Sequence, residues 1–351
     1  MKICMIIDSL AAAGAERVVV TLSEAFYKQG HQVDIILWNN IIEYQINPNI
    51  NIHVLEKKTA QELKKLITEI NNLNNGAFDY IYSHLHGKIK IVKQAKLKNI
   101  YYVFHIPISH RFKSKNNVIK WLKKKKLQMR YRNENLITVS DGIKDDLIEN
   151  KIKANSINSI YNPFEFESIK QQANQEENDI PKDEYIINVA RFHFQKRQDI
   201  LLKAFKQSNL NCKLLLVGKG SKEEYQKIEN LINELELQEK VIIVGFNSNP
   251  YPLIKNAKLL VLSSDFEGLP MVLIEALILN TPIVSTNCKS GPSEIMKDNL
   301  ANYLVSTGDV DSLALKMYDA YHNPPLINQN DLKRFDADII SKKYLSLKEN
   351  N

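Results

Sequence analysis

Short runs of apolar residues alternate with stretches of helical periodicity along most of the chain. Each run has the length and the β-branched or aromatic content of a buried strand, and helical stretches such as 17–28 and 61–73 follow. The expected strands are 2–7, 32–38, 80–82, 100–104 and 136–139 in the first half, and 185–189, 213–217, 241–244, 259–262 and 282–285 in the second. This alternation predicts an α/β protein with two doubly wound parallel-sheet halves.

A polar segment rich in Gln, Asn and Glu separates the two halves at 165–179. The chain of 351 residues exceeds the roughly 250–300 at which a single hydrophobic core usually stops growing. We therefore expect a first domain at 1–163, a linker at 164–181 and a second domain at 182–330. The remainder, 331–351, is expected to form a polar C-terminal helix that could pack back on the first domain.

Composition and cysteine usage exclude several classes of protein. The chain is 44% hydrophobic and 25% charged, which excludes disordered and fibrous proteins. Cys4, Cys212 and Cys288 are odd in number and far apart, so neither a disulfide framework nor a zinc motif is indicated. No stretch reaches the ~18 apolar residues of a membrane span. The first apolar run ends at Asp8, too early for a signal peptide, so we expect a first strand and a cytoplasmic protein.

The net positive charge of the chain comes entirely from its first half. The net charge is +7, and residues 1–163 hold 25 Lys and Arg against 14 Asp and Glu. Ten basic residues and no acidic one fall between 111 and 132, with apolar residues interleaved. This pattern predicts an amphipathic helix that lies on an anionic membrane, although a solvated Lys-rich helix is the alternative. Nucleic acid is disfavoured because no recognition motif is present. The expected membrane contacts are Lys120, Trp121, Lys123, Lys124, Lys125 and Lys126.

Two glutamates flank an expected helix start after the strand 259–262. Pro270 suits the first turn of a helix whose apolar body follows at 271–279. The free N–H groups of a helix that starts at the carboxyl end of a parallel strand favour a phosphate. Because carboxylates repel phosphate, Glu267 and Glu275 are better explained by hydrogen bonds from hydroxyls on either side of a pyrophosphate. A helix cap and a solvated glutamate are the structural alternatives.

Basic residues follow the strand 185–189. Arg191 leaves this strand at its carboxyl end and Lys196 precedes the next helix, so both could contact one diphosphate. Arg197 is expected to be an ordinary solvated loop residue. Near the N-terminus, the loop 8–17 lacks the full G-x-G-x-x-G pattern. Gly14 in this loop fits either a close backbone approach to a ligand or a tight turn.

Seven motifs together resemble the retaining family 4 glycosyltransferases, which have the GT-B fold of two Rossmann-like domains facing a central cleft. The motifs follow the family's order over nearly the whole chain. They are Gly14-Ala15-Glu16-Arg17, Val139-Ser140-Asp141-Gly142-Ile143, Ile160-Tyr161-Asn162-Pro163, Arg191 with Lys196, Val217-Gly218-Lys219-Gly220, Val244-Gly245-Phe246, and Glu267 with Glu275. The resemblance implies an acceptor-binding first domain and a second domain that binds a nucleotide sugar.

The resemblance also implies which residues bind the donor and which act in catalysis. Glu267 would hold hydroxyls of the donor sugar and Glu275 those of the ribose. Arg191 and Lys196 would neutralise the diphosphate as it leaves. The implied donor contacts are completed by Gly14, Gly245, Phe246, Gly268, Leu269, Met271 and Val272.

His105 matches the family's histidine near the sugar carbon under attack, whereas a lone histidine after an apolar strand can also be structural. Pro270 departs from the family pattern because it has no N–H to donate to a phosphate. No metal or other cofactor is expected. The Asp-x-Asp sequence at 309–311 is explained by a helix cap, and the one at 336–338 by a position within the terminal helix.

The resemblance implies a retaining glycosyltransferase that uses a nucleotide diphosphate sugar, with UDP favoured, and we expect it to be metal-independent. The acceptor would be a glycan hydroxyl, expected to be lipid-linked, in bacterial capsule, O-antigen or lipopolysaccharide synthesis. The enzyme would lie peripherally at the inner face of the cell membrane. Two alternatives stay open: a nucleotide-sugar epimerase or hydrolase of the same fold, and a non-catalytic module that binds a glycan or a membrane.

Overall fold

The computed structural model describes residues 1–11, 14–85, 87–109, 117–177 and 180–348. Contacts divide the chain into two compact units: unit 1 is Met1–Phe164 with Arg334–Asn351, and unit 2 is Glu165–Lys333. The segment expected as a linker contains a helix, α6 (Phe166–Gln172), which packs against α9 (Tyr251–Asn256) and α10 (Met271–Ile278). Most of that segment therefore belongs to unit 2. Part of the basic stretch, 111–116, lies outside the described residues.

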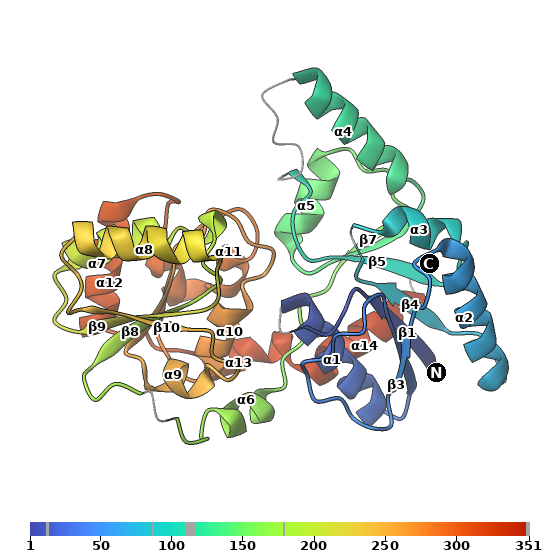
Figure 1. Cartoon of the computed structure of the whole chain (residues 1–351), viewed down its shortest axis with the longest axis horizontal. Coiled ribbons are helices and arrows are strands. Elements are labelled where there is room, and N and C mark those ends of the chain that lie inside the picture. The colour runs from blue at the N-terminus through green and yellow to red at the C-terminus, as the bar shows by residue number, and fades with distance from the viewer. Residues whose placement is uncertain (12–13, 86, 110–116, 178–179, 349–351) are drawn as a thin grey trace. The chain divides into compact units, whose positions relative to one another are not determined.

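Unit 1 is built on a seven-stranded parallel sheet (Figure 1). The strands lie in the spatial order β3-β2-β1-β4-β5-β6-β7. Neither edge strand appears in the sequence prediction, because β3 (Asn51–Val54) and β7 (Ser156–Ser159) are half polar and only partly buried. The other strands are β1 (Lys2–Ile7), β2 (Gln32–Leu37), β4 (Tyr80–Ser83), β5 (Ile100–Phe104) and β6 (Asn135–Thr138).

Among the residues that the structure describes, five helices of the first half and one from the end of the chain belong to unit 1. They are α1 (Gly14–Lys28), α2 (Ala60–Leu73), α3 (Ile89–Gln94), α4 (Asn117–Arg130), α5 (Asp141–Glu149) and α14 (Ala337–Leu345). The terminal helix α14 packs against α1. The Tyr82 hydroxyl donates to the carbonyl oxygen of Tyr344 over 2.9 Å, and Gln29 Nε2 donates to Ser341 Oγ over 2.6 Å. Because Ile340 and Tyr344 are buried, the helix that looked polar in sequence has an apolar face toward unit 1.

Unit 2 is built on a six-stranded parallel sheet in the order β10-β9-β8-β11-β12-β13. Its strands are β8 (Tyr185–Val189), β9 (Lys213–Val217), β10 (Val241–Gly245), β11 (Leu259–Leu262), β12 (Ile283–Thr286) and β13 (Leu304–Val305). The two residues of β13 are too few for a sequence pattern. Helices α6, α9 and α10 are joined by α7 (Gln198–Ser208), α8 (Lys222–Glu234), α11 (Pro292–Ile295), α12 (Val310–His322) and α13 (Gln329–Leu332). The two parallel sheets confirm the α/β prediction.

Each sheet has a point at which its strand order reverses. In unit 1 the chain runs outward from β1 through β2 to β3, and then resumes on the other side of β1 with β4. In unit 2 it runs from β8 through β9 to β10 and resumes beside β8 with β11. The loops after the two central strands diverge at such a switch point, and ligands of open α/β sheets bind there, beyond the carboxyl ends. The fold therefore predicts that ligands bind at the loops after β1 and β4 in unit 1, and after β8 and β11 in unit 2.

The three cysteines are free and buried, consistent with the absence of a disulfide pattern in the sequence. Burial raises the pKa of Cys212 to about 11 and that of Cys288 to about 12, so both remain thiols at neutral pH.

Candidate functional site

An ion pair joins the two loops at the switch point of unit 2. Lys196 ends a short 3₁₀ turn (Phe194–Lys196) after β8, and Glu267 lies in the loop between β11 and α10. Lys196 Nζ is 2.6 Å from Glu267 Oε1, and the two side chains are only 16% and 9% exposed. Both side chains are largely shielded from solvent, so breaking the pair would leave a desolvated charge without its partner. The structure thus brings together two residues that the sequence had placed in one site.

Three hydrogen bonds to backbone carbonyl oxygens tie the same two loops to each other. Gln195 Nε2 donates to the carbonyl oxygen of Phe266 over 2.6 Å, and the N–H of Asp265 donates to the carbonyl oxygen of Gln195 over 2.9 Å. Ser263 Oγ donates to the carbonyl oxygen of Lys196 over 2.8 Å. Sequence reasoning missed Gln195 and Ser263, since a single polar residue in a loop forms no pattern. They hold the Lys196 and Glu267 loops in a fixed relation.

Arg197 is not a solvated loop residue, contrary to the sequence-based expectation. Its guanidinium binds Asp199 through Nε and Nη2 and Asp265 through Nη1, with distances of 2.9–3.3 Å. Its backbone has a φ of 49°, in the left-handed region that side-chain-bearing residues rarely adopt. Because Asp265 belongs to the Glu267 loop, Arg197 adds a second charged link between the two loops.

Helix α10 begins at Met271, one residue later than expected, so Pro270 is its N-cap and not part of its first turn. Thr59, Ser140, Ser221 and Asp309 each cap a helix with a side-chain oxygen, whereas Pro270 makes no side-chain cap. The first N–H groups of a helix have no intrahelical acceptor. The amino end of α10, beside the Lys196–Glu267 pair, therefore favours an anion.

Glu275 lies inside α10 and is buried. The Tyr251 hydroxyl is 3.5 Å from Glu275 Oε1. A buried carboxylate in an apolar helix excludes the alternative of a solvated surface glutamate, and Glu267 is also buried. Arg191 behaves differently, because its side chain is exposed and makes no hydrogen bond or ion pair with the residues that the structure describes. It remains available to a ligand.

Two glycine loops of unit 2 follow the carboxyl ends of β9 and β10. A Cβ on Gly218 would come within 2.0 Å of the Ala190 carbonyl oxygen, so only glycine allows the β9 loop to approach so closely. The N–H of Gly218 donates to the carbonyl oxygen of Gly245 over 2.7 Å. Phe246 is half exposed after β10, and Lys219 Nζ lies 4.9 Å from its ring centroid. An accessible aromatic ring at a strand's carboxyl end suits a stacked base.

The candidate residues of unit 1 follow β1 and β5. His105 follows β5, and its Nε2 is 2.8 Å from Nδ1 of His84, which follows β4; the rings are stacked with centroids 5.1 Å apart. Burial lowers the pKa of His105 to about 4, so its imidazole is neutral at neutral pH. His84 was not identified from the sequence. Gly14 is exposed and begins α1.

The first aspartate of each Asp-x-Asp sequence is the N-cap of a helix. Asp309 accepts from the N–H of Ser312 over 2.9 Å at the start of α12, as the sequence suggested. Asp336 precedes α14 and accepts from the N–H groups of Asp338 and Ile339, so it caps that helix and does not lie within it. Over the described ranges, His, Cys, Asp and Glu side chains form no group of three or more that could hold a metal ion.

Both halves of the chain match glycosyltransferase families. The model described as "Glycosyltransferase Family 4" matches residues 12–168, and the one described as "Glycosyl transferases group 1" matches residues 170–336. Together with the two parallel-sheet units, these matches show that the chain belongs to the family 4 glycosyltransferases of GT-B fold.

The curated relatives include bacterial enzymes of the cell envelope. The chain is 29% identical over 338 residues to the N-acetylgalactosamine-N,N'-diacetylbacillosaminyl-diphospho-undecaprenol 4-alpha-N-acetylgalactosaminyltransferase of Campylobacter jejuni, covering 89% of this chain and 88% of the relative. It is 32% identical over 180 residues to the lipopolysaccharide 1,6-galactosyltransferase of Escherichia coli, about half of each protein (50% and 48%). HepE of Anabaena, solved with UDP and glucose, has the same fold, with a TM-score of 0.78 over 100% of both chains at 17% identity.

Proposed function

We propose that the protein is a retaining glycosyltransferase that transfers a sugar from a UDP-sugar to a hydroxyl of a lipid-linked glycan in bacterial surface polysaccharide synthesis. The observation that carries the proposal is the buried Lys196–Glu267 pair beside the uncapped start of α10. An ammonium and free N–H groups stabilise a diphosphate, and carboxylates accept hydrogen bonds from sugar hydroxyls. The activities of the Campylobacter jejuni and Escherichia coli relatives support a diphospho-lipid or lipopolysaccharide acceptor.

Each residue has a distinct part in the proposed reaction. Lys196 and Arg191 neutralise the β-phosphate as the bond to the sugar breaks, without a metal ion. Glu267 binds hydroxyls of the donor sugar, and Glu275 binds those of the ribose. Neutral His105 donates or accepts a hydrogen bond near the sugar carbon. The acceptor hydroxyl attacks on the face that the diphosphate leaves and gives its proton to the departing β-phosphate, so UDP is released and the anomeric configuration is retained.

A thermal-shift assay with nucleotides tests the donor site. UDP is expected to raise the unfolding midpoint by about 5 °C or more at a hundredfold excess over its Kd, because a ligand that binds only the folded state stabilises it by about 2.7 kcal/mol. ADP and GDP should shift it less, and EDTA should leave the UDP shift unchanged. Release of UDP from a UDP-sugar only when a glycan acceptor is added separates a transferase from an epimerase, a hydrolase or a non-catalytic module. No stabilisation by any nucleotide would contradict the proposal.

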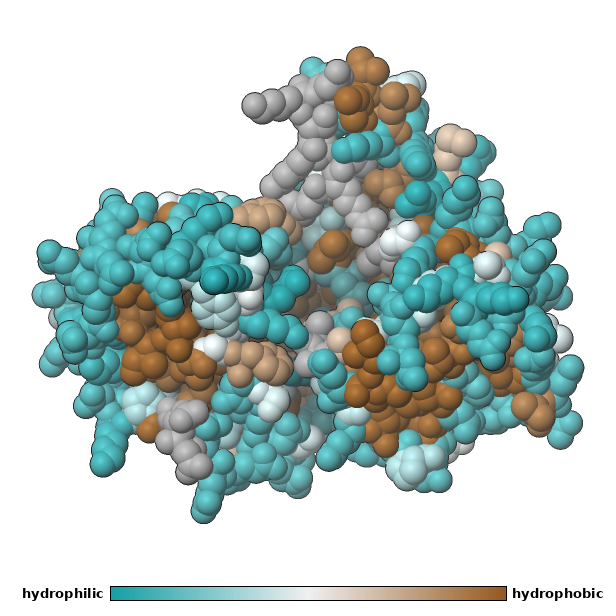
Figure 2. All heavy atoms as spheres, viewed as in Figure 1, coloured by the Kyte–Doolittle hydropathy of each residue, from teal (hydrophilic) through white to brown (hydrophobic). Residues whose placement is uncertain are grey.

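We also propose that the protein binds peripherally to a membrane, and helix α4 supports this. Only Leu127 of α4 is buried, whereas Trp121 is 57% and Met129 76% exposed. Val118, Leu122 and Met129 lie four and seven residues apart, which places them on one face of the helix. Figure 2 shows hydrophobic residues (brown) among hydrophilic ones (teal) at the top of the view, where Figure 1 draws α4. An exposed apolar stripe among lysines is typical of a helix that lies in a lipid interface.

Helix α3 extends the basic surface of α4. A hollow of about 760 Å³ lies between the two helices, with apolar Leu122 and Met129 in its lining. Its charged lining residues are all basic, and they are Lys90, Lys93, Lys96, Lys125, Lys126 and Arg130. This arrangement attracts anionic headgroups to the same face as the apolar stripe. In the part of the chain that the structure describes, no helix has the length and hydropathy to cross a bilayer.

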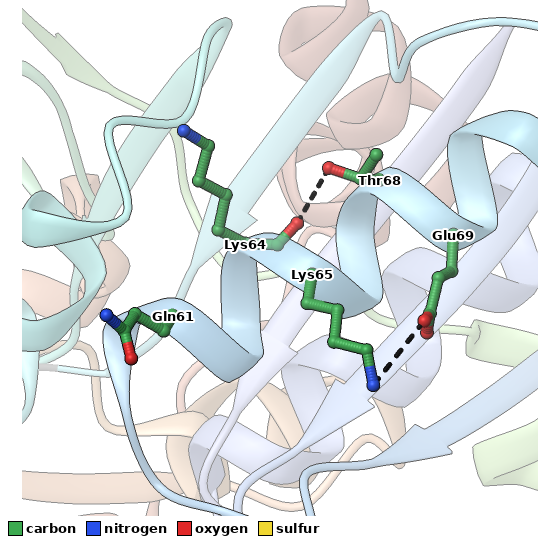
Figure 3. Close-up of a pocket in the computed structure, with 5 residues that line it drawn as sticks. All are labelled: Gln61, Lys64, Lys65, Thr68 and Glu69. Atoms are coloured by element: carbon green, nitrogen blue, oxygen red, sulfur yellow. Dashed lines mark hydrogen bonds and ion pairs between the residues drawn. The ribbon is translucent and has the colours of Figure 1, made fainter.

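Co-sedimentation with vesicles tests the membrane surface. The chain is expected to bind phosphatidylglycerol-containing vesicles at low salt, and Lys125→Gln with Lys126→Gln should weaken binding about thirtyfold, at ~1 kcal/mol per lysine. The matched control is Lys64→Gln with Lys65→Gln on α2, an exposed helix of the same unit (Figure 3), which should change little. Membrane binding through α4 would be contradicted if the wild type did not sediment with the vesicles, or if the α4 and α2 variants lost vesicle binding equally.

A further inference from the structure

The switch point of unit 1 holds a polar cluster that the proposed donor site does not use. Asp8 follows β1, Asn39 lies just after β2, and Lys88 comes before α3, after β4. Asn39 Nδ2 donates to Asp8 Oδ1 over 3.0 Å, and Lys88 Nζ binds the same oxygen. We call Asp8, Asn39 and Lys88 the Asp8 cluster. Three loops that are far apart in sequence thus meet at one carboxylate.

The Asp8 cluster has a counterpart in unit 2. The Lys196–Glu267 pair connects the loops after β8 and β11, between which the order of the second sheet reverses. The Lys88–Asp8 pair connects the loops after β4 and β1, between which the order of the first sheet reverses. Each unit therefore places an ammonium–carboxylate pair where its fold leaves room for a ligand.

The Asp8 cluster is accessible to a ligand. The Asp8 side chain is 50% exposed and that of Lys88 30%, both more than the pair of unit 2. Within the described residues, Asp8 Oδ2 accepts no hydrogen bond, because Asn39 and Lys88 both donate to Oδ1. A surface ion pair of this kind contributes little to stability, so a purely structural role leaves its position at the switch point unexplained.

Neighbouring residues hold the cluster in a fixed arrangement. Lys88 Nζ lies 5.3 Å from the ring centroid of Trp38, which is buried. Lys58 Nζ donates to Asn39 Oδ1 and so turns the amide nitrogen toward Asp8. The N–H of Asn39 donates to the carbonyl oxygen of Asp8 over 2.7 Å. Donor and acceptor groups are therefore oriented before a ligand arrives, which lowers the entropic cost of binding.

The chemistry of the cluster suits a neutral sugar. A sugar hydroxyl donates to one group and accepts from another, and here a free carboxylate oxygen stands beside an ammonium and an amide N–H. The carboxylate disfavours a phosphate, and the ammonium disfavours a metal cation. Ile41 and Ile42, in the loop after β2, are 48% and 43% exposed. The N–H of Leu10 donates to the carbonyl oxygen of Ile41 over 2.8 Å, so this apolar surface adjoins the loop after Asp8 and suits the C–H face of a pyranose ring.

We propose that the Asp8 cluster binds the hydroxyls of a hexopyranose unit of the acceptor glycan. The proposal rests on the transferase function proposed above, and it assigns that function an acceptor subsite in unit 1. Asp8 accepts a hydrogen bond through Oδ2, and Lys88 donates to a neighbouring sugar oxygen.

Saturation-transfer NMR with the full chain and saturating UDP tests this assignment. The probes are the methyl α-glycosides of glucose, galactose, N-acetylglucosamine and N-acetylgalactosamine at millimolar concentration. At least one is expected to bind the wild type, and Asp8→Asn and Lys88→Met should each weaken that binding about tenfold or more, as expected when a hydrogen bond to a charged group is lost. The matched controls are Lys65→Met and Glu69→Gln. Each removes one partner of the Lys65–Glu69 ion pair, in which Nζ and Oε1 are 3.6 Å apart on the exposed face of α2 (Figure 3).

Controls separate this proposal from the donor site. The UDP-induced thermal shift should be equal in the wild type, Asp8→Asn and Lys88→Met, which also shows that the variants are folded. Binding of a glycoside through Asp8 without stabilisation by UDP would support the subsite and contradict the donor function. The subsite proposal is overturned if none of the four glycosides binds the wild type, or if the Asp8→Asn and Lys88→Met variants bind as well as the α2 controls.

Discussion

The Lys196→Ala variant is expected to transfer sugar about a hundred- to a thousandfold more slowly than the wild type, the loss typical for one removed group that stabilises developing charge. Its ammonium lies 2.6 Å from Glu267 Oε1 and is largely shielded from solvent, and the proposed leaving group carries two negative charges. The rate is measured as UDP released from the donor in the presence of an extract of lipid-linked glycans.

Loss of Lys196 also affects stability, and a second variant separates the two effects. Without its partner, the buried Glu267 carboxylate costs about 3 kcal/mol, the lower end of the range for broken buried pairs. Lys196→Ala combined with Glu267→Gln removes that charge. The midpoint of thermal unfolding should therefore recover, while the rate of sugar transfer stays low. Lys196→Arg keeps the charge with a different shape and should retain more activity than Lys196→Ala. A Lys196→Ala enzyme with wild-type rates would overturn the proposed role.

The Gly218→Ala variant is expected to lose about 4 kcal/mol of unfolding free energy, which lowers the midpoint by roughly 10 °C. The added Cβ would lie 2.0 Å from the Ala190 carbonyl oxygen and 2.7 Å from the carbonyl carbon. These are backbone atoms, so no side chain can rotate away, and the φ of 153° is itself unfavourable for alanine. Thermal unfolding followed by circular dichroism measures the change.

Gly308→Ala is the matched control for Gly218→Ala. Gly308 also lies in unit 2 and has a positive φ of 79°, but a Cβ there meets no atom within 4 Å. Only backbone strain then opposes the substitution, at about 1 kcal/mol. If both variants lost the same unfolding free energy, backbone strain and not the contact with the β8 loop would explain why residue 218 is glycine.

Periodicity in the sequence predicted the central strands of both sheets and the edge strand β10, but not the edge strands β3, β7 and β13. Buried strands such as β1 and β8 consist of consecutive apolar residues, because both faces of a parallel sheet are covered. The half-polar edge strand β7 and the two-residue β13 have no such run, and they form because a neighbouring strand supplies their hydrogen bonds. Likewise the apolar face of α14 is evident only from its contact with α1, over three hundred residues away in sequence.

The sequence by itself determined the alternation of strands and helices, the position of Lys196, Glu267 and Glu275 at strand ends or in a helix, and the basic character of 111–132. These properties are local, since each depends on residue type and spacing. Only the tertiary structure decided that Lys196 pairs with Glu267, that Arg197 links two loops, that His84 stacks on His105, and that Asp8, Asn39 and Lys88 meet. Such contacts join residues up to 80 positions apart, and they depend on which strands the sheet places side by side, which no local pattern encodes.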